Sequence, residues 1–214
     1  MSAEIPGQPF RWRVGQHISI VGRNGSGKSM LASRMLSQRR WRIIVRTKPD
    51  NIEYPDALVV QTAAELMARR DVDAFVLDPE YERQPEEIWQ TLEYAYRTER
   101  WTIYIDELLM VDKQLALTPE VDKLLTQGRS KGISVVVGMQ RPAQVSRFAL
   151  SESMHVISFA LERRDAKIIG EACGDRMQRT VEDLGRYEFA WRESVSRRIW
   201  TGRLDIKTGR LVAT

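Results

Sequence analysis

The residues best suited to phosphate chemistry lie near the N-terminus, where the chain reads Gly-x-x-x-x-Gly-Lys-Ser from Gly22 to Ser29. Glycines permit a tight turn whose N–H groups face phosphate oxygens, while the lysine reaches the β- and γ-phosphates and the hydroxyl binds Mg²⁺. An apolar run precedes this segment and a helical pattern follows it, as a P-loop requires. The sequence therefore predicts a Walker A motif for ATP, with nucleotide contacts from Gly22, Arg23, Asn24, Gly25, Ser26, Gly27, Lys28, Ser29 and Met30.

A pair of carboxylates ends a second apolar run, Ile103-Tyr104-Ile105-Asp106-Glu107. This is the form of a Walker B element, in which Asp106 holds Mg²⁺ together with Ser29. We expect Glu107 to orient and activate a water for attack on the γ-phosphate. That role favours a hydrolase over a kinase, which must exclude water. A solvated Asp-Glu pair capping a loop is the alternative, and the upstream P-loop argues against it.

Gln140 ends a third apolar run, Ile133 to Met139. Its side-chain amide at the end of a buried strand would sense the γ-phosphate or position the water. Polar residues are common at strand ends, so this residue needs support from its neighbours.

Apolar runs alternate with helical patterns along most of the chain, which indicates an α/β fold with a mostly parallel sheet covered by helices on both faces. The carboxyl ends of parallel strands form the ligand-binding edge of such a sheet, and the P-loop, Asp106-Glu107 and Gln140 all follow strands. We expect an N-terminal arm at 1–15, an ATPase core at 16–174, and a C-terminal helix with a β-hairpin at 175–214 as an appendage of the same domain.

Composition narrows the classes of protein that fit. The single cysteine, Cys173, excludes an internal disulfide, and with only two histidines a zinc site is implausible. Neither a signal peptide nor a run of roughly 18 apolar residues is present, so we expect no transmembrane segment. The net charge is +4, and arginine, which binds phosphate bidentately, far outnumbers lysine. This balance permits contact with nucleic acid.

The segment from Gln127 to Pro142 resembles the HerA/FtsK superfamily of DNA-pumping P-loop ATPases. It carries Gly128-Arg129, a Gly-Ile pair, an apolar strand and Gln140-Arg141-Pro142, with Met139 where the family has threonine. The resemblance implies a RecA-like ASCE fold with Gln140 as sensor and Arg129 as a catalytic finger inserted into the neighbouring subunit's site. Arg129 capping its own helix is the alternative, and the rivals for the finger role are Arg141, Arg147, Arg163 and Arg164.

Chain length favours the small genome-packaging ATPases of membrane-containing, double-jelly-roll phages and viruses within that superfamily. Such a likeness implies an ATP- and Mg²⁺-dependent double-stranded DNA translocase that fills a preformed capsid. It also implies a pentameric or hexameric ring, contacts with capsid-vertex or membrane proteins, and a location in the host cytoplasm and the virion. DNA would be held by its backbone, independently of sequence, with contacts sought near Lys48, Arg83 or Lys113.

Two alternatives stay open. One is a Zot-like ATPase of phage morphogenesis or secretion that acts on protein. The other is a nucleotide-binding structural protein of the virion.

Overall fold

A single long sheet runs through the computed structural model, which describes residues 4–5, 8–9, 12–48, 52–208 and 210–213. The strand order is β12-β11-β10-β9-β3-β8-β7-β4-β6-β5. The strands are β3 (His17–Val21), β4 (Arg42–Val45), β5 (Leu58–Val60), β6 (Ala74–Leu77), β7 (Thr102–Ile105), β8 (Ser134–Met139), β9 (Ser153–Phe159), β10 (Glu188–Glu193), β11 (Ile199–Asp205) and β12 (Arg210–Ala213). Strands from β9 to β5 pair in parallel, and β10, β11 and β12 add antiparallel strands beyond β9.

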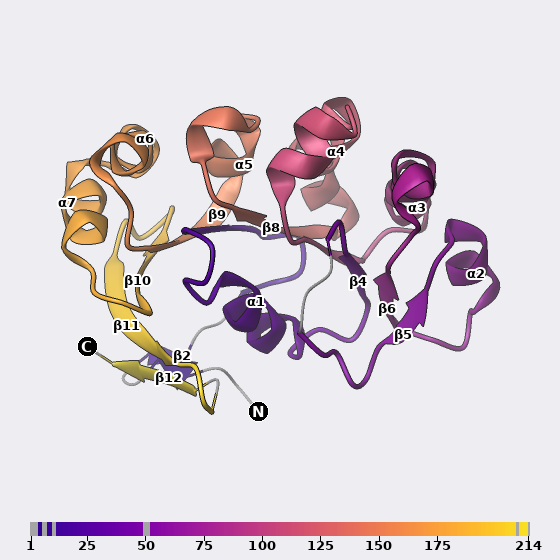
Figure 1. Cartoon of the computed structure of the whole chain (residues 1–214), viewed down its shortest axis with the longest axis horizontal. Coiled ribbons are helices and arrows are strands. Elements are labelled where there is room, and N and C mark those ends of the chain that lie inside the picture. The colour runs from indigo at the N-terminus through magenta and orange to yellow at the C-terminus, as the bar shows by residue number, and fades with distance from the viewer. Residues whose placement is uncertain (1–3, 6–7, 10–11, 49–51, 209, 214) are drawn as a thin grey trace.

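Helices cover both faces of this sheet unequally. Figure 1 shows α1 (Lys28–Leu36) alone on one face and the longer row of helices on the other. That row contains α2 (Ala63–Ala68), α3 (Gln84–Thr98), α4 (Thr118–Gln127), α5 (Phe148–Ser151), α6 (Arg163–Cys173) and α7 (Asp175–Asp183). Shorter helical turns are η1 (Tyr81–Arg83), the π-helical η2 (Met110–Gln114), η3 (Gly128–Lys131) and η4 (Pro142–Gln144).

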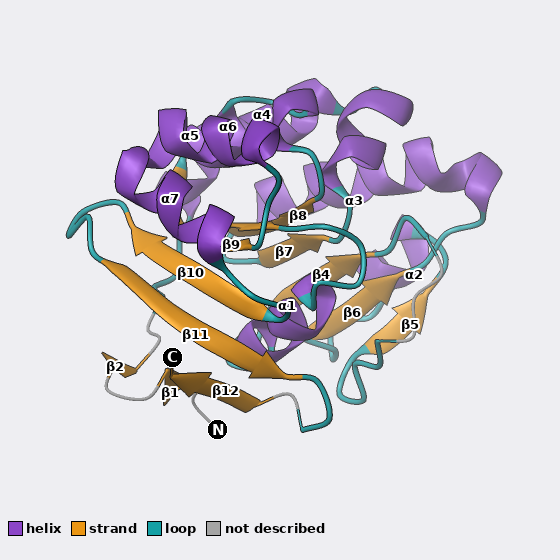
Figure 2. Ribbon diagram, turned by 60° about the vertical axis from the view of Figure 1, so that its left-hand side comes forward, coloured by secondary structure: helices purple, strands orange, loops and turns teal. Residues whose placement is uncertain are grey.

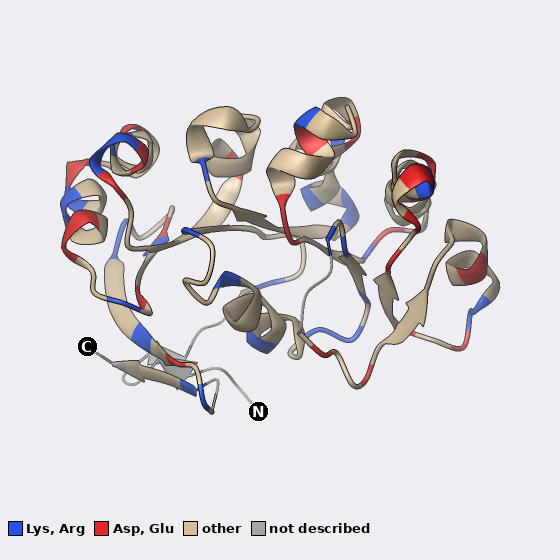
Figure 3. Ribbon diagram, in the orientation of Figure 1, with Lys and Arg blue, Asp and Glu red and all other residues tan. Residues whose placement is uncertain are grey.

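Side chains along a strand alternate between the two faces of the sheet, so the core divides into two apolar clusters, one on each face. These clusters hold the helices against the sheet. On the α1 face, Ile20 and Tyr104 pack with Leu31 of the helix. On the other face, Ile103 and Val137 belong to the larger cluster, which includes residues of α3, α4 and α6. Charged residues lie mainly on helices and loops (Figure 3). The central strands are therefore buried on both sides, as their continuous apolar sequences predict.

The α/β fold with a mostly parallel sheet is confirmed. Helix α2 begins with a capping box: the Thr62 hydroxyl accepts a hydrogen bond from the Glu65 amide, and the Glu65 carboxylate accepts one from the Thr62 amide. The division into 1–15, 16–174 and 175–214 stays a prediction. Within it, the C-terminal hairpin proves to be part of the main sheet.

Strand β12 and the short pair β1 (Glu4–Ile5) and β2 (Gln8–Pro9) were not predicted. β12 pairs antiparallel with β11, and β1 lies against β12 (Figure 2). Strand β1, near the start of the chain, thus lies beside β12, near its end. None of the helices formed by the described residues has the length and apolar character needed to cross a bilayer.

Gly138 in β8 allows the backbone of Asp106 to approach closely. A Cβ atom at position 138 would lie 2.3 Å from the Asp106 carbonyl oxygen, well inside van der Waals contact. A backbone obstacle cannot rotate away, so Gly138→Ala should destabilise the protein by about 3 kcal/mol, the upper end of the usual overpacking cost. Urea unfolding measures this change. Gly185→Ala is the control, because its Cβ would meet only the flexible Glu188 carboxylate, and an equal loss in both variants would contradict the prediction.

Candidate nucleotide-hydrolysis site

Four segments that follow parallel strands lie on one rim of the sheet. The P-loop follows β3, Lys48 lies beyond the end of β4, Asp106-Glu107 follows β7, and Gln140 follows β8. Strands β3, β8, β7 and β4 are neighbours in this order and run the same way. Their carboxyl ends therefore face a common edge, where α/β sheets bind ligands.

The P-loop has the backbone conformation that its glycines permit. Gly25 and Gly27 have φ of +72° and +103°, in the left-handed region that side chains disfavour. Gly27 is also the residue that precedes α1, so the positive end of the helix faces the loop. A Cβ on Gly27 would lie 2.7 Å from a methyl group of Leu204. The C-terminal strand β11 therefore packs directly on the phosphate-binding loop.

Lys28 is buried at the base of this loop. Its Nζ donates a hydrogen bond of 3.0 Å to the Arg23 carbonyl oxygen. Burial lowers the pKa of Lys28 to about 8; the carboxylate of Glu107 opposes this shift and the ammonium of Lys48 adds to it. A bound polyanion would supply the negative charge that this buried ammonium lacks.

Asp106 is oriented by two hydroxyl groups. The Ser29 hydroxyl donates to Asp106 Oδ1 at 2.7 Å, and the Tyr104 hydroxyl donates to the same oxygen at 2.6 Å. Burial, followed by the charge of Asp106, raises the pKa of Tyr104 well above its usual value, so Tyr104 stays a hydrogen-bond donor. A serine hydroxyl beside one carboxylate fits the few protein oxygens through which Mg²⁺ binds together with substrate phosphates. No cluster of three or more acidic, histidine or cysteine residues suited to a metal occurs among the described residues.

Glu107 is held on one side and unpartnered on the other. Its Oε2 accepts a hydrogen bond from the Gln140 amide and lies 3.5 Å from Nζ of Lys48. Its Oε1 is buried and has no hydrogen-bond partner within the described part of the chain. An unpartnered buried carboxylate oxygen is costly, and a water molecule at this oxygen would remove the cost. The carboxylate is therefore fixed in the way that a general base requires.

A cavity of about 260 Å³ extends from this site toward the C-terminal strands. Lys28, Ser29 and Asp106 of the site line it, and so do Tyr187 and Ile206, which lie next to the C-terminal strands. Tyr187 has a φ of +64°, a strained conformation for a residue with a side chain. The other residues that line this cavity are Asn24, Gly25, Gly27, Met30, Lys48 and Ile52.

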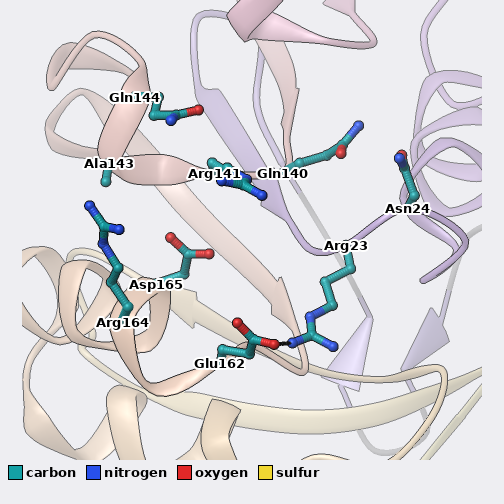
Figure 4. A pocket seen from close by; sticks show the side chains of 9 residues that line it. All are labelled: Arg23, Asn24, Gln140, Arg141, Ala143, Gln144, Glu162, Arg164 and Asp165. Atoms are coloured by element: carbon teal, nitrogen blue, oxygen red, sulfur yellow. Dashed lines mark ion pairs between the residues drawn. The ribbon is translucent and has the colours of Figure 1, made fainter.

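Figure 4 shows a second cavity, of about 380 Å³, to which the P-loop contributes Arg23 and Asn24. It is bordered by Asn24 and Gln140, and Arg141 and Arg164 line it. Arg23 also contributes, with its guanidinium paired to the Glu162 carboxylate. Two rivals for the finger role thus lie on the same rim as the chain's own site.

Arg129 lies at the opposite rim. It belongs to η3, which precedes β8, whereas Gln140 follows that strand. Six strand residues at about 3.3 Å each put roughly 20 Å between the two ends. Arg129 is exposed, and its carbonyl, not its guanidinium, is the part that approaches Gly15. The structure therefore brings Lys28, Glu107 and Gln140 together and leaves Arg129 apart from them.

Sequence reasoning missed three residues of this site. Tyr104 could have been found, because residues two apart on a strand point to the same face and Tyr104 stands two before Asp106. Lys48 was considered only as a DNA contact, although its place beyond a strand end was a usable signal. Tyr187 is half-buried and lines the cavity, and no sequence motif points to it.

The rim, the P-loop and the parallel sheet define an α/β P-loop NTPase with a RecA-like fold. No protein-family model matches the chain. Its sequence is 29% identical over 160 residues to the DNA packaging ATPase P9 of Enterobacteria phage PRD1, a match that covers 72% of this chain and 68% of that protein. The chain is thus similar to a genome-packaging ATPase, as its motifs together with its length predicted.

Solved structures agree on the fold. The genome packaging NTPase B204 of Sulfolobus turreted icosahedral virus 2, in complex with ATP-gammaS, superposes with a TM-score of 0.69 at 18% identity, over 87% of this chain and 95% of that one. The pCW3 conjugation coupling protein TcpA with ATPgS gives 0.59 at 16% identity, over 91% and 62% of the two chains. At these identities the likeness concerns the fold.

Proposed function

We propose that this chain is an ATPase that drives double-stranded viral DNA into a preformed capsid. The observation that carries the hydrolytic part is the Glu107 carboxylate, which Gln140 orients on the same rim as Lys28. The packaging part rests on the similarity to the packaging ATPase of phage PRD1.

Hydrolysis follows from this arrangement. Lys28 and the P-loop amides bind the triphosphate, and Ser29 with Asp106 would hold Mg²⁺, which offsets charge on the β- and γ-phosphates. Glu107 accepts a proton from a water whose oxygen bonds to the γ-phosphorus. The bond from that phosphorus to the bridging oxygen breaks, giving ADP and phosphate. Gln140 keeps the Glu107 carboxylate in place during proton transfer.

Coupling to DNA requires more than one copy of the chain. In this proposal the copies form a ring, a pentamer or hexamer, at the capsid vertex, where capsid or membrane proteins anchor it. DNA passes through the ring and is held by its phosphates, since a pump must move any sequence. The ring forms in the host cytoplasm and joins the virion.

ATPase rate with and without duplex DNA, at several salt concentrations, tests this function. We expect DNA to stimulate hydrolysis, and the stimulation to fall as salt rises because phosphate contacts release counterions. An ATPase that DNA fails to stimulate at any salt concentration would contradict the DNA-translocating role. Lack of any hydrolysis would contradict the enzymatic role as well.

A further inference from the structure

A second ammonium group accompanies the acidic pair of the site. Nζ of Lys48 is 3.5 Å from Glu107 Oε2 and 3.9 Å from Asp106 Oδ2. The side chains of Asp106 and Glu107 are only 5% and 12% exposed, against 44% for Lys48. Adjacent buried carboxylates repel each other unless a positive charge lies close. Lys48 supplies that charge in the nucleotide-free protein.

We propose that Lys48 is a positioning residue whose ammonium stays beside the carboxylates of Asp106 and Glu107 until nucleotide binds. This inference rests on the function proposed above. Bound Mg²⁺ and triphosphate would balance the charge of the two carboxylates, which frees Lys48 to turn from them to the phosphates.

The hydrogen bonds of Asp106 indicate for which of its two oxygens Lys48 and a divalent cation compete. Oδ1 already accepts from the hydroxyls of Ser29 and Tyr104. Oδ2 faces Lys48, so a second cation that approaches Oδ2 meets an ammonium of like charge. Lys48 and a divalent cation therefore compete for this carboxylate.

The new partner for Lys48 lies in the same cavity. Lys48 lines the space that Lys28 and Ser29 also line. A triphosphate bound there brings several negative charges within reach of a half-exposed, flexible side chain. When Lys48 leaves Glu107, Gln140 still holds the Glu107 carboxylate through Oε2. The other oxygen, Oε1, has no partner among the described residues and can accept a hydrogen bond from water. The Glu107 carboxylate is therefore freed from its ion pair with Lys48 only when the nucleotide binds.

Binding of Mn²⁺ alone to the nucleotide-free chain, followed by the loss of the free-ion EPR signal, tests the competition directly. Lys48→Gln removes the ammonium, so Mn²⁺ should bind about 5-fold more tightly, the factor that a screened interaction of about 1 kcal/mol gives. Lys48→Arg keeps the charge and should bind Mn²⁺ as the wild type does. Lys113→Gln is the matched control, because Lys113 pairs with buried Asp112 at 3.6 Å outside the site.

A second measurement separates competition from a merely structural role. Lys48→Gln should lower the melting temperature of the nucleotide-free chain, and saturating Mg²⁺ without nucleotide should remove most of the difference, because the cation then balances the two carboxylates in the variant. Lys48→Met serves if the glutamine variant folds poorly.

Unchanged or weaker Mn²⁺ binding in both Lys48→Gln and Lys48→Met would overturn the proposal. So would a melting deficit that saturating Mg²⁺ alone leaves intact. Failure of the wild-type chain to hydrolyse ATP would instead count against the proposed function, and would leave the Mn²⁺ result standing.

Discussion

Glu107→Gln should lower kcat for ATP hydrolysis by about 10²–10⁴-fold, the usual contribution of a positioned general base. Glutamine keeps the shape of the side chain, so an oxygen at this position can still accept the hydrogen bond from Gln140. It cannot take a proton from water, and this step is the one that fails. Steady-state phosphate release measures the loss.

Nucleotide affinity should stay close to that of the wild type, because the P-loop and Lys28 are unchanged. Binding of a fluorescent ATP analogue tests this separation between binding and catalysis. Glu82→Gln is the matched control, since Glu82 is exposed and lines neither of the two cavities at the P-loop. Hydrolysis within 10-fold of the wild type in Glu107→Gln would assign the base to another residue. Filled capsids produced with Glu107→Gln would contradict the packaging role.

The chemical centre could be predicted because each of its parts is local in the sequence. A P-loop needs eight consecutive residues, and Asp106 and Gln140 each end an apolar run. Parallel strands then bring these ends to one rim without any further information. The fold class follows from the same alternation of apolar runs and helices.

The remaining parts depend on packing between distant segments. Leu204 packs against Gly27, and Tyr187 and Ile206 line the nucleotide cavity, yet no pattern in the sequence joins residues 187–206 to the P-loop. Strand β12 was missed because it is short and follows a polar turn. Which strand completes an antiparallel edge is decided by cross-strand packing. The contribution of the C-terminal strands to the site therefore became visible only in three dimensions.

The place of Arg129 restricts what it can do. It stands at the amino end of β8, roughly a strand length from the Gln140 end of that strand, so its guanidinium cannot reach the γ-phosphate of its own chain. Within the described residues no ion pair engages that guanidinium. A head-to-tail ring brings opposite sides of neighbouring copies together. We therefore retain the proposal that Arg129 acts on the neighbour's site, over capping of its own helix.

Arg129→Ala should lower kcat of the assembled protein by about 10³–10⁵-fold, the range for a finger supplied in trans. Nucleotide affinity of the single chain should not change, since the chain's own P-loop is intact. Arg164→Ala is the control, because Arg164 lines the cavity beside the chain's own Gln140. If Arg164 were the finger, Arg164→Ala would lower kcat more than Arg129→Ala does.

Mixing the two inactive variants gives the sharpest result. In a ring assembled from equal amounts of Arg129→Ala and Glu107→Gln chains, some sites combine an intact Glu107 with an intact Arg129 from the neighbour. Random assembly of a head-to-tail ring makes these about a quarter of all sites, so hydrolysis should return to a similar fraction of the wild-type rate. Helix capping acts within one chain and predicts no recovery. A mixture as inactive as its components would therefore remove Arg129 from the catalytic site.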